Sequence, residues 1–279
     1  MPLTTFLLII AVPVVLYLLF IVNLYLVQAR HTYCPTAEIA TTPDSHGLEF
    51  EAVDFESSDG LMLHGWFVPR AVDSGGSAEK ERVVLFFHGN TGNISDCIDT
   101  LAMFHQLGLS TFIFDYRGYG RSQGSPTEQG TYDDAEAAWA YLLRDRGIKS
   151  EDVIVIGRSL GAAIASAHVA RHAPGALVIE STFTSAPELA AEMFRIFPAR
   201  LMSRFKYRVR DNIANTHCPI LIVHSSNDEV IPFHHGTRLY EVANEPKAFL
   251  EISGEHAQGC FTSGQDYTDG LKRFLNSVY

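Results

Sequence analysis

Ser159 is the first residue whose setting points to chemistry, because it stands in the G-x-S-x-G run of residues 157–161. This run follows the apolar stretch 153–156 and precedes an alanine-rich segment that starts near Ala162. A strand that turns sharply into a helix lifts a serine hydroxyl out of a sheet, and flanking glycines remove Cβ atoms that would collide there. The context predicts Ser159 as a nucleophile, whereas the five-residue motif alone also occurs in structural turns.

A serine hydroxyl is a weak nucleophile unless a base accepts its proton and a third group orients that base. Asp228 follows the strand-like run 219–224, and His256 lies in a Gly-containing segment after the extended run 247–252. Both residues come after Ser159, at loop positions that follow strands. We predict His256 as the general base and Asp228 as the acid that orients it, with Glu229 as the competing acid.

Residues 88–93 follow the apolar run 83–87 and read His-Gly-Asn-Thr-Gly-Asn. Attack on a carbonyl places negative charge on its oxygen, and two fixed backbone N–H donors stabilise that charge by roughly 3 kcal/mol each. We expect the donors of this oxyanion hole to be the amides of Asn90 and Leu160. The alternative is an ordinary turn, and His88 itself is expected to be structural.

The overall composition narrows the classes of function. Net charge is -11, from 32 acidic and 21 basic side chains, so the average field repels nucleic acid and no nucleic-acid partner is expected. The four cysteines are scattered without the paired spacing of a zinc site, so no metal is expected. No cofactor is implied, because the oxyanion donors do the work that a metal would otherwise do.

The elements that position these residues can be read from the apolar pattern. Five short unbroken apolar runs predict strands buried on both faces, namely residues 83–87, 111–114, 153–156, 176–179 and 220–223. Helical patterns at 95–107, 131–145 and 162–172 lie between them. Strands at 48–56 and 61–68 form a hairpin before a Gly/Ser-rich tip at 74–77. The sequence therefore predicts an α/β fold, with a mostly parallel central sheet and helices on both faces.

Residues 184–216 contain no strand-like run and predict a short helical cap over the sheet, with helical patterns at 187–195 and 201–210. The apolar side chains of this cap are expected to line a substrate pocket, and those singled out are Phe194, Phe197, Leu201, Met202 and Phe205. The alternative is that the same side chains only pack the cap on the core.

Residues 3–27 carry no charge and exceed the roughly 20 residues that a helix needs to cross a bilayer. We expect one N-terminal transmembrane anchor at 1–30, a polar linker at 31–47 and the catalytic domain at 48–279. The alternative is a cleaved signal peptide. Arg30 follows the span and favours a cytoplasmic domain. Because the anchor contains no catalytic residue, we expect it to be separable from the chemistry.

Together these segments resemble the α/β-hydrolases of the bud-emergence type, which include membrane-associated α/β-hydrolase domain proteins of animals. The motifs that carry the resemblance are residues 87–93, 115–122, 157–161 and 180–183, together with the Asp228 and His256 loops. The resemblance implies the α/β-hydrolase fold, the triad Ser159, Asp228 and His256, and oxyanion donors at Asn90 and Leu160. Residues 115–122 lack the G-x-x-x-x-G-K-[ST] pattern of a phosphate loop, so they are expected to form a loop that borders the site.

The activity favoured by the sequence is hydrolysis of an ester or thioester through an acyl-enzyme intermediate. The anchor and the apolar cap favour a lipophilic acyl group, carried by a small molecule, a lipid or an acylated protein. Two alternatives stay open, because some members of the family resemble serine peptidases that cleave amides, and a catalytically silent membrane scaffold would share the same fold.

Overall fold

The computed structural model describes residues 2–71 and 81–279, so the Gly/Ser-rich tip expected at 74–77 lies outside the described residues. Its centre is an eight-stranded sheet in the order β10-β9-β8-β7-β4-β6-β3-β2. The strands β10, β9, β8, β7, β4 and β6 run parallel, whereas β3 pairs antiparallel with both β6 and β2. The predicted mostly parallel sheet and its antiparallel opening hairpin are therefore confirmed.

The strands of this sheet are β2 Glu51–Glu56, β3 Met62–Val68, β4 Val83–Phe87, β6 Ser110–Phe114, β7 Val153–Arg158, β8 Ala176–Glu180, β9 Ile220–Ser225 and β10 Lys247–Ile252. A separate two-stranded parallel ribbon consists of β1 Cys34–Pro35 and β5 Thr91–Gly92. The helices are α1 Leu3–Thr32, α2 Ile98–Gln106, α3 Glu128–Ala140, α4 Leu160–Val169, α5 Ala186–Met193, α6 Ala199–Met202, α7 Val209–Ala214, α8 His234–Val242, α9 Gly259–Ser263 and α10 Gln265–Val278.

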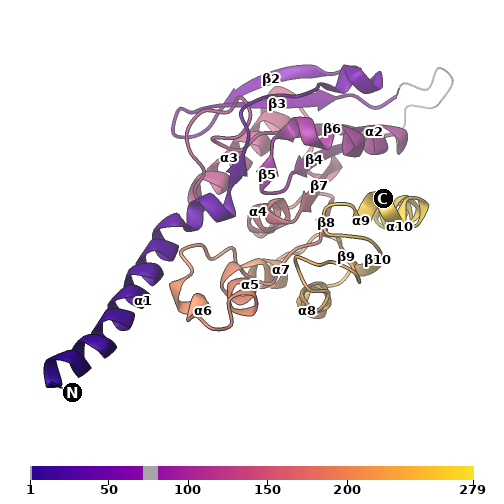
Figure 1. Ribbon diagram of the computed structural model, residues 1–279. Coiled ribbons are helices and arrows are strands. Elements are labelled where there is room, and N and C mark those ends of the chain that lie inside the picture. Colours follow the sequence, from indigo (N-terminus) through magenta and orange to yellow (C-terminus); the bar gives the residue numbers. More distant parts are fainter. Residues whose placement is uncertain (1, 72–80) are drawn as a thin grey trace.

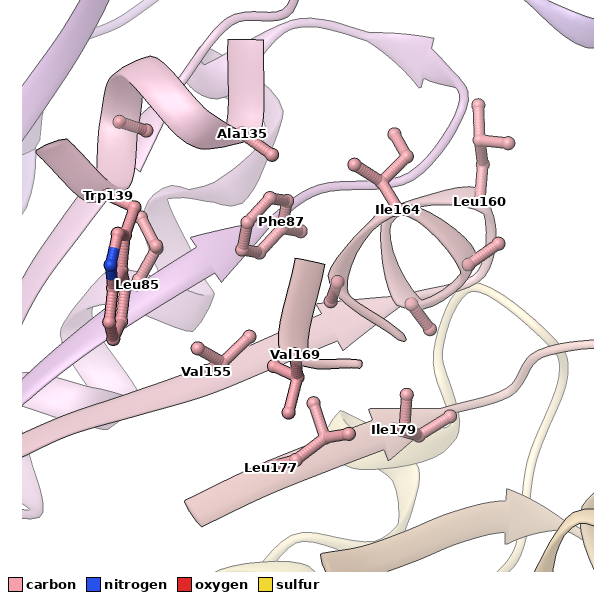
Figure 2. Close-up of a cluster of buried hydrophobic side chains, with 14 of the residues drawn as sticks. Leu85, Phe87, Ala135, Trp139, Val155, Leu160, Ile164, Val169, Leu177 and Ile179 are labelled. Carbon is pink, nitrogen blue, oxygen red and sulfur yellow. The ribbon is translucent and has the colours of Figure 1, made fainter. Parts of the chain in front are cut away.

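Helices cover both faces of the sheet, so the central strands are buried on both sides. Alternate side chains of β4 divide between two cores, with Leu85 and Phe87 in one and Val84 and Phe86 in the other. The first core packs against α3, α4, α7 and α8, and part of it is shown in Figure 2. The second core packs against α2, α9 and α10. Burial on both faces explains why these strands appear in the sequence as unbroken apolar runs.

Helix α1 extends away from the body and carries the N-terminus at its far end (Figure 1). Its segment Ile10–Thr32 has a mean hydropathy of 2.5 and is long and apolar enough to cross a membrane. The chain that follows α1, expected as a linker, lies against the domain. Tyr33 is buried in the first core, and Cys34 N–H donates to the Asn90 carbonyl at 2.9 Å. The end of α1 is thereby tied to the loop after β4.

The cap differs from its expected helices in one place. Helix α5 agrees with the helical pattern at 187–195, but the pattern at 201–210 was wrong over most of its length, since α6 ends at Met202 and α7 begins at Val209. The helix is interrupted here because a carboxylate far away in the sequence binds the backbone of this segment. The Glu128 side chain accepts hydrogen bonds from Lys206 N–H at 2.7 Å and Tyr207 N–H at 2.8 Å, which holds this stretch in an irregular, non-helical form.

Candidate active site

Ser159 occupies a strained turn between β7 and α4, with φ 54° and ψ -120°. A Cβ on Gly157 would lie 2.6 Å from Ala162 Cα, and one on Gly161 would lie 2.1 Å from the Phe87 carbonyl oxygen. Only glycine therefore fits on both sides of the turn, as the sequence indicated. Ser159 N–H donates to the Glu180 carbonyl at 2.9 Å, so β8 holds the turn in place.

The three residues predicted for the chemistry meet at the carboxyl ends of the parallel strands. Ser159 Oγ lies 3.0 Å from His256 Nε2, and His256 Nδ1 lies 2.8 Å from Asp228 Oδ2. The strands β7, β9 and β10 bring them there, because each residue follows one of these parallel strands, with only β8 lying between β7 and β9. The arrangement has the connectivity of nucleophile, base and orienting acid.

The Asp228 carboxyl is held in its ionised form. Its side chain is fully buried, and burial raises the pKa, but hydrogen bonds outweigh that effect and keep the net pKa below the ordinary value of 3.8. These bonds come from His256, and from Val230 N–H and Ile231 N–H, which both donate to Asp228 Oδ1 at 3.0 and 2.7 Å. An ionised acid at this position fixes the His256 proton on Nδ1 and leaves Nε2 free to accept the Ser159 proton.

The competing residues have other contacts. Glu229 Oε2 accepts the backbone N–H of His256 at 2.9 Å and has no contact with the imidazole ring, so it anchors the loop. The buried His224 ring donates from Nε2 to the Ile231 carbonyl at 2.9 Å. His88 donates from Nδ1 to the Gly89 carbonyl, and its burial lowers its pKa to about 4, which keeps the ring neutral. His88 thus has the structural role expected from the sequence, and Glu229 does not contact the ring of the base.

Asn90 and Leu160 line the same cavity as Ser159, and within residues 2–71 and 81–279 neither backbone amide donates to another protein group. Asn90 is held from two directions. Its carbonyl accepts hydrogen bonds from Tyr119 Oη at 2.8 Å and from Cys34 N–H at 2.9 Å. Two unoccupied N–H donors on a rigid loop and at a helix start have the chemistry of an oxyanion hole.

The loop of residues 115–122 borders the site, as expected, and holds other segments of the site through hydrogen bonds and ion pairs. The Arg117 guanidinium is buried and pairs with Asp134 at 2.8 Å and with Asp59 at 2.8 Å, which closes the loop on α3 and on the β2–β3 turn. Tyr116 Oη donates to the His88 carbonyl at 2.9 Å. Tyr116 and Tyr119 thus hold the segment that carries the Asn90 amide. The sequence analysis identified this loop as bordering the site but assigned no role to its tyrosines.

A cavity of about 760 Å³ opens beside Ser159 and His256. Four of the five predicted pocket residues line it, namely Phe194, Phe197, Met202 and Phe205. The fifth, Leu201, does not, since it points outward and is 87% exposed. The other side chains are mainly apolar and come from several elements, among them Leu160, Phe183, Leu189, Met193 and Ile231.

One wall of the cavity comes from α1, which the sequence analysis did not anticipate. Leu24, Gln28, His31 and Thr32 line it together with the cap. Gln28 donates from Nε2 to the Met202 carbonyl and accepts from Arg204 N–H, both at 2.9 Å. The sequence analysis missed this contact, because polar pairs between residues more than 170 positions apart leave no trace in local periodicity. Activity of the domain without the anchor stays a prediction.

Two histidine–carboxylate groups among the described residues have donor atoms within 4.8 Å of one another, Glu136 with His168 and His172, and Glu192 with His234 and His235. Each carboxylate also faces an arginine, Arg171 at 3.4 Å and Arg238 at 3.6 Å. The negative charge that would attract a cation is thus already balanced, and we interpret both groups as ion-pair clusters.

The comparisons with known proteins agree with this geometry. Residues 78–211 match the family described as "Serine aminopeptidase, S33". An uncharacterized protein of Mycobacterium tuberculosis is 34% identical over 252 residues, which cover 90% of this chain and 88% of that protein. The α/β-hydrolase domain-containing protein WAV2 of Arabidopsis thaliana is 31% identical over 255 residues, covering 84% and 81% of the two chains.

Among solved structures, the esterase Pf2001 of Pyrococcus furiosus superimposes with a TM-score of 0.72 at 18% sequence identity. The superposition covers 88% of this chain and 97% of the esterase. At this level of identity the likeness is one of fold.

Proposed function

The chain belongs to the α/β-hydrolase family, and on that premise we propose that it is a membrane-anchored serine hydrolase that cleaves carboxylic ester or thioester bonds. The observation that carries the proposal is the continuous pair of contacts from Ser159 Oγ to His256 Nε2 at 3.0 Å and from His256 Nδ1 to Asp228 Oδ2 at 2.8 Å. A weak nucleophile, a base within reach and a buried acid are what acyl transfer requires.

In the proposed reaction, Ser159 Oγ attacks the substrate carbonyl carbon as His256 Nε2 accepts its proton. The tetrahedral intermediate collapses, and the leaving alcohol or thiol takes the proton from His256. A water molecule then gives a proton to Nε2 and attacks the acyl-enzyme, and the acid departs as Ser159 regains its hydrogen. Asp228 stabilises the imidazolium of each step and stays ionised throughout.

We propose that the Asn90 and Leu160 amides bind the oxyanion. The free donors on both sides of Ser159 support this assignment, and so does the fixed Asn90 peptide. Donors that need no rearrangement at the moment of reaction lower the barrier by roughly 3 kcal/mol each.

The acyl group is proposed to be lipophilic and of medium or long chain length. The cavity is lined mainly by apolar side chains of the cap, with Phe194, Phe197, Met202 and Phe205 among them. Each methylene transferred from water to such a pocket contributes about 0.8 kcal/mol, which is about a fourfold gain in affinity. The value of kcat/KM is therefore expected to rise along a series of p-nitrophenyl esters from acetate until the pocket is full.

The second candidate is amide hydrolysis, which the description of the matching family favours. An aminopeptidase needs a carboxylate to bind the free amino group of its substrate. Among the described lining residues of the cavity there is no Asp or Glu, which favours ester or thioester substrates. The purified protein should hydrolyse p-nitrophenyl octanoate and an octanoyl thioester at least tenfold faster than an aminoacyl p-nitroanilide, and the reverse order would select the peptidase.

Helix α1 is proposed to be a retained anchor, with the domain on the cytoplasmic side. Removal of α1 as a signal peptide would take Leu24 and Gln28 out of the cavity wall and leave Met202 and Arg204 without their partners. The proposed cytoplasmic orientation of the domain is based on Arg30, a basic residue that follows the apolar run. Protease protection in sealed membrane vesicles tests the orientation.

A further inference from the structure

The tip of the cap exposes large apolar side chains, and their contact with water is energetically unfavourable. We use "cap tip" for residues 193–202, where Ile196 is 83% exposed and Leu201 is 87% exposed. Met193 and Phe194 are also exposed by about half of their surface. A contiguous group of large exposed apolar side chains is typical of a surface that another apolar phase covers.

The cap tip lies against the middle of α1. The Phe197 ring has its centroid 6.3 Å from that of Tyr17 and 5.7 Å from that of Phe20. Figure 1 shows α6 beside the part of α1 that projects away from the body. The exposed side chains Ile196 and Leu201 flank Phe197, so the apolar surface of the cap continues the apolar surface of the helix.

These contacts determine how deep the cap tip would lie in a bilayer that α1 spans. Phe20 and Tyr17 precede Val27, the last residue of the apolar run, by 7 and 10 positions. At about 1.5 Å per residue they lie roughly 10 and 15 Å further along the helix axis, within one half of a hydrocarbon core about 30 Å thick. When α1 spans the bilayer, the Phe197 ring that packs against them lies at the same depth.

We propose that the cap tip is embedded in the same leaflet as α1, and that the cavity takes its acyl chain directly from that leaflet. The inference rests on the proposed function and narrows it, since the substrate becomes a membrane-resident lipid ester or lipid-like acyl group rather than a water-soluble ester. The cavity wall supports this route, because Leu24 of α1 and Met193, Phe194 and Phe197 of the cap tip share one lining. An acyl chain that lies between α1 and the cap tip enters the cavity without crossing water.

The basic residues of the cap are compatible with this depth. Arg200 pairs with Glu188 at 3.7 Å, and the Arg204 guanidinium lies 5.3 Å from the centre of the Tyr25 ring. Long basic side chains at a membrane boundary direct their charge toward the phosphate layer while their methylene stems stay in apolar surroundings. Arg195 and Arg200 belong to the cap tip itself and are both exposed, so their long stems can direct the charge toward the phosphate layer while the apolar side chains of the tip enter the leaflet.

A fluorescent probe tests the embedding independently of catalysis. The full chain carrying Ile196→Trp is reconstituted in phosphatidylcholine vesicles with or without bromine on the acyl chains. Bromine should quench the added emission by more than half. The matched control is Met62→Trp on β3, an exposed apolar position remote from the cap, whose added emission should be unchanged. Equal emission of the Ile196→Trp protein in both kinds of vesicle overturns the proposal.

Kinetics of the full chain test the route of the substrate. The double variant Ile196→Glu, Leu201→Glu should hydrolyse water-soluble p-nitrophenyl butyrate within twofold of the unmodified protein. Its kcat/KM for p-nitrophenyl palmitate held in vesicles should fall at least tenfold. Met62→Glu should change neither rate. Unchanged palmitate hydrolysis by the double variant, or an equal loss on both esters, overturns the proposal. Failure of the unmodified protein on butyrate would instead contradict the proposed function.

Discussion

Replacing Asp228 by Asn tests the assignment of the acid, and the structure fixes how the new side chain must sit. Asp228 Oδ1 accepts two backbone N–H groups, from Val230 and Ile231, while Oδ2 faces His256 Nδ1. In Asp228→Asn the amide oxygen must take the Oδ1 position, because an NH₂ group cannot accept these bonds. The amide nitrogen is then forced toward His256 Nδ1.

This orientation reverses the tautomer of the base. An NH₂ group donates to His256 Nδ1, so the ring proton moves to Nε2, which lies 3.0 Å from Ser159 Oγ. A protonated Nε2 cannot accept the serine proton. The expected loss in kcat is about 10⁴-fold, equivalent to about 5.4 kcal/mol of barrier. The fold should persist, since both Oδ1 bonds are retained.

The assay is turnover of p-nitrophenyl butyrate, with thermal unfolding as the control for folding. Glu229→Gln is the matched variant, because Glu229 accepts only the backbone N–H of His256 and a Gln oxygen can accept the same bond. Its turnover should stay within about threefold of the unmodified protein. If Glu229→Gln loses as much as Asp228→Asn, or if Asp228→Asn keeps more than a tenth of the activity, the assignment of the acid is refuted.

Three further predictions follow from named contacts. Ser159→Ala should abolish labelling by a fluorophosphonate and cut kcat by about 10⁶-fold with the fold intact, and persistent labelling would identify another nucleophile. Burial raises the pKa of Asp115 to about 7 from 3.8, so the folded protein holds a proton that the unfolded chain loses, and this group's contribution to stability falls as pH rises from 4 to 7. Asp115→Asn, which keeps an acceptor for Ile94 N–H, should flatten that decline by up to about 2.6 kcal/mol between pH 5 and 8, measured by urea unfolding, and an unchanged slope would contradict the shift. Tyr33→Phe removes the 2.6 Å hydrogen bond with Tyr207 and should lower the thermal midpoint by about 2 to 4 °C, whereas an unchanged midpoint would show that the bond contributes nothing.

The catalytic core was predictable because its sequence signals are local. The strand β4 is buried on both faces and therefore reads as five consecutive apolar residues, and β7 runs directly into a turn that only glycines permit. Asp228 and His256 each follow a strand of the same parallel sheet, so the order of elements brings them to one edge. In these segments the local pattern of apolar residues and glycines is sufficient to predict the strands and the loops that follow them.

The cap and the end of α1 were not predictable in the same way. Residues 203–208 have a helical pattern, yet the Glu128 carboxylate, 78 positions away from Lys206, holds their backbone out of a helix. The pairing of Gln28 with Met202 and Arg204 joins residues 174 and 176 positions apart. Single long-range polar contacts override a weak local preference in a short segment, and no window of the sequence contains both partners.

Contacts between residues far apart in the sequence also join the end of α1 to the loop that carries Asn90. Helix α1, the proposed membrane anchor, ends at Thr32, whose carbonyl accepts a hydrogen bond from the Asn90 side chain at 3.1 Å. The next residues pair with the loop that presents the Asn90 amide, through Cys34 N–H and the β1–β5 ribbon. Thr32 and Cys34 thus both contact Asn90, whose backbone amide is the proposed oxyanion donor. Helix α1 and the residues just after it therefore contact the loop after β4, and α1 also forms part of the cavity wall.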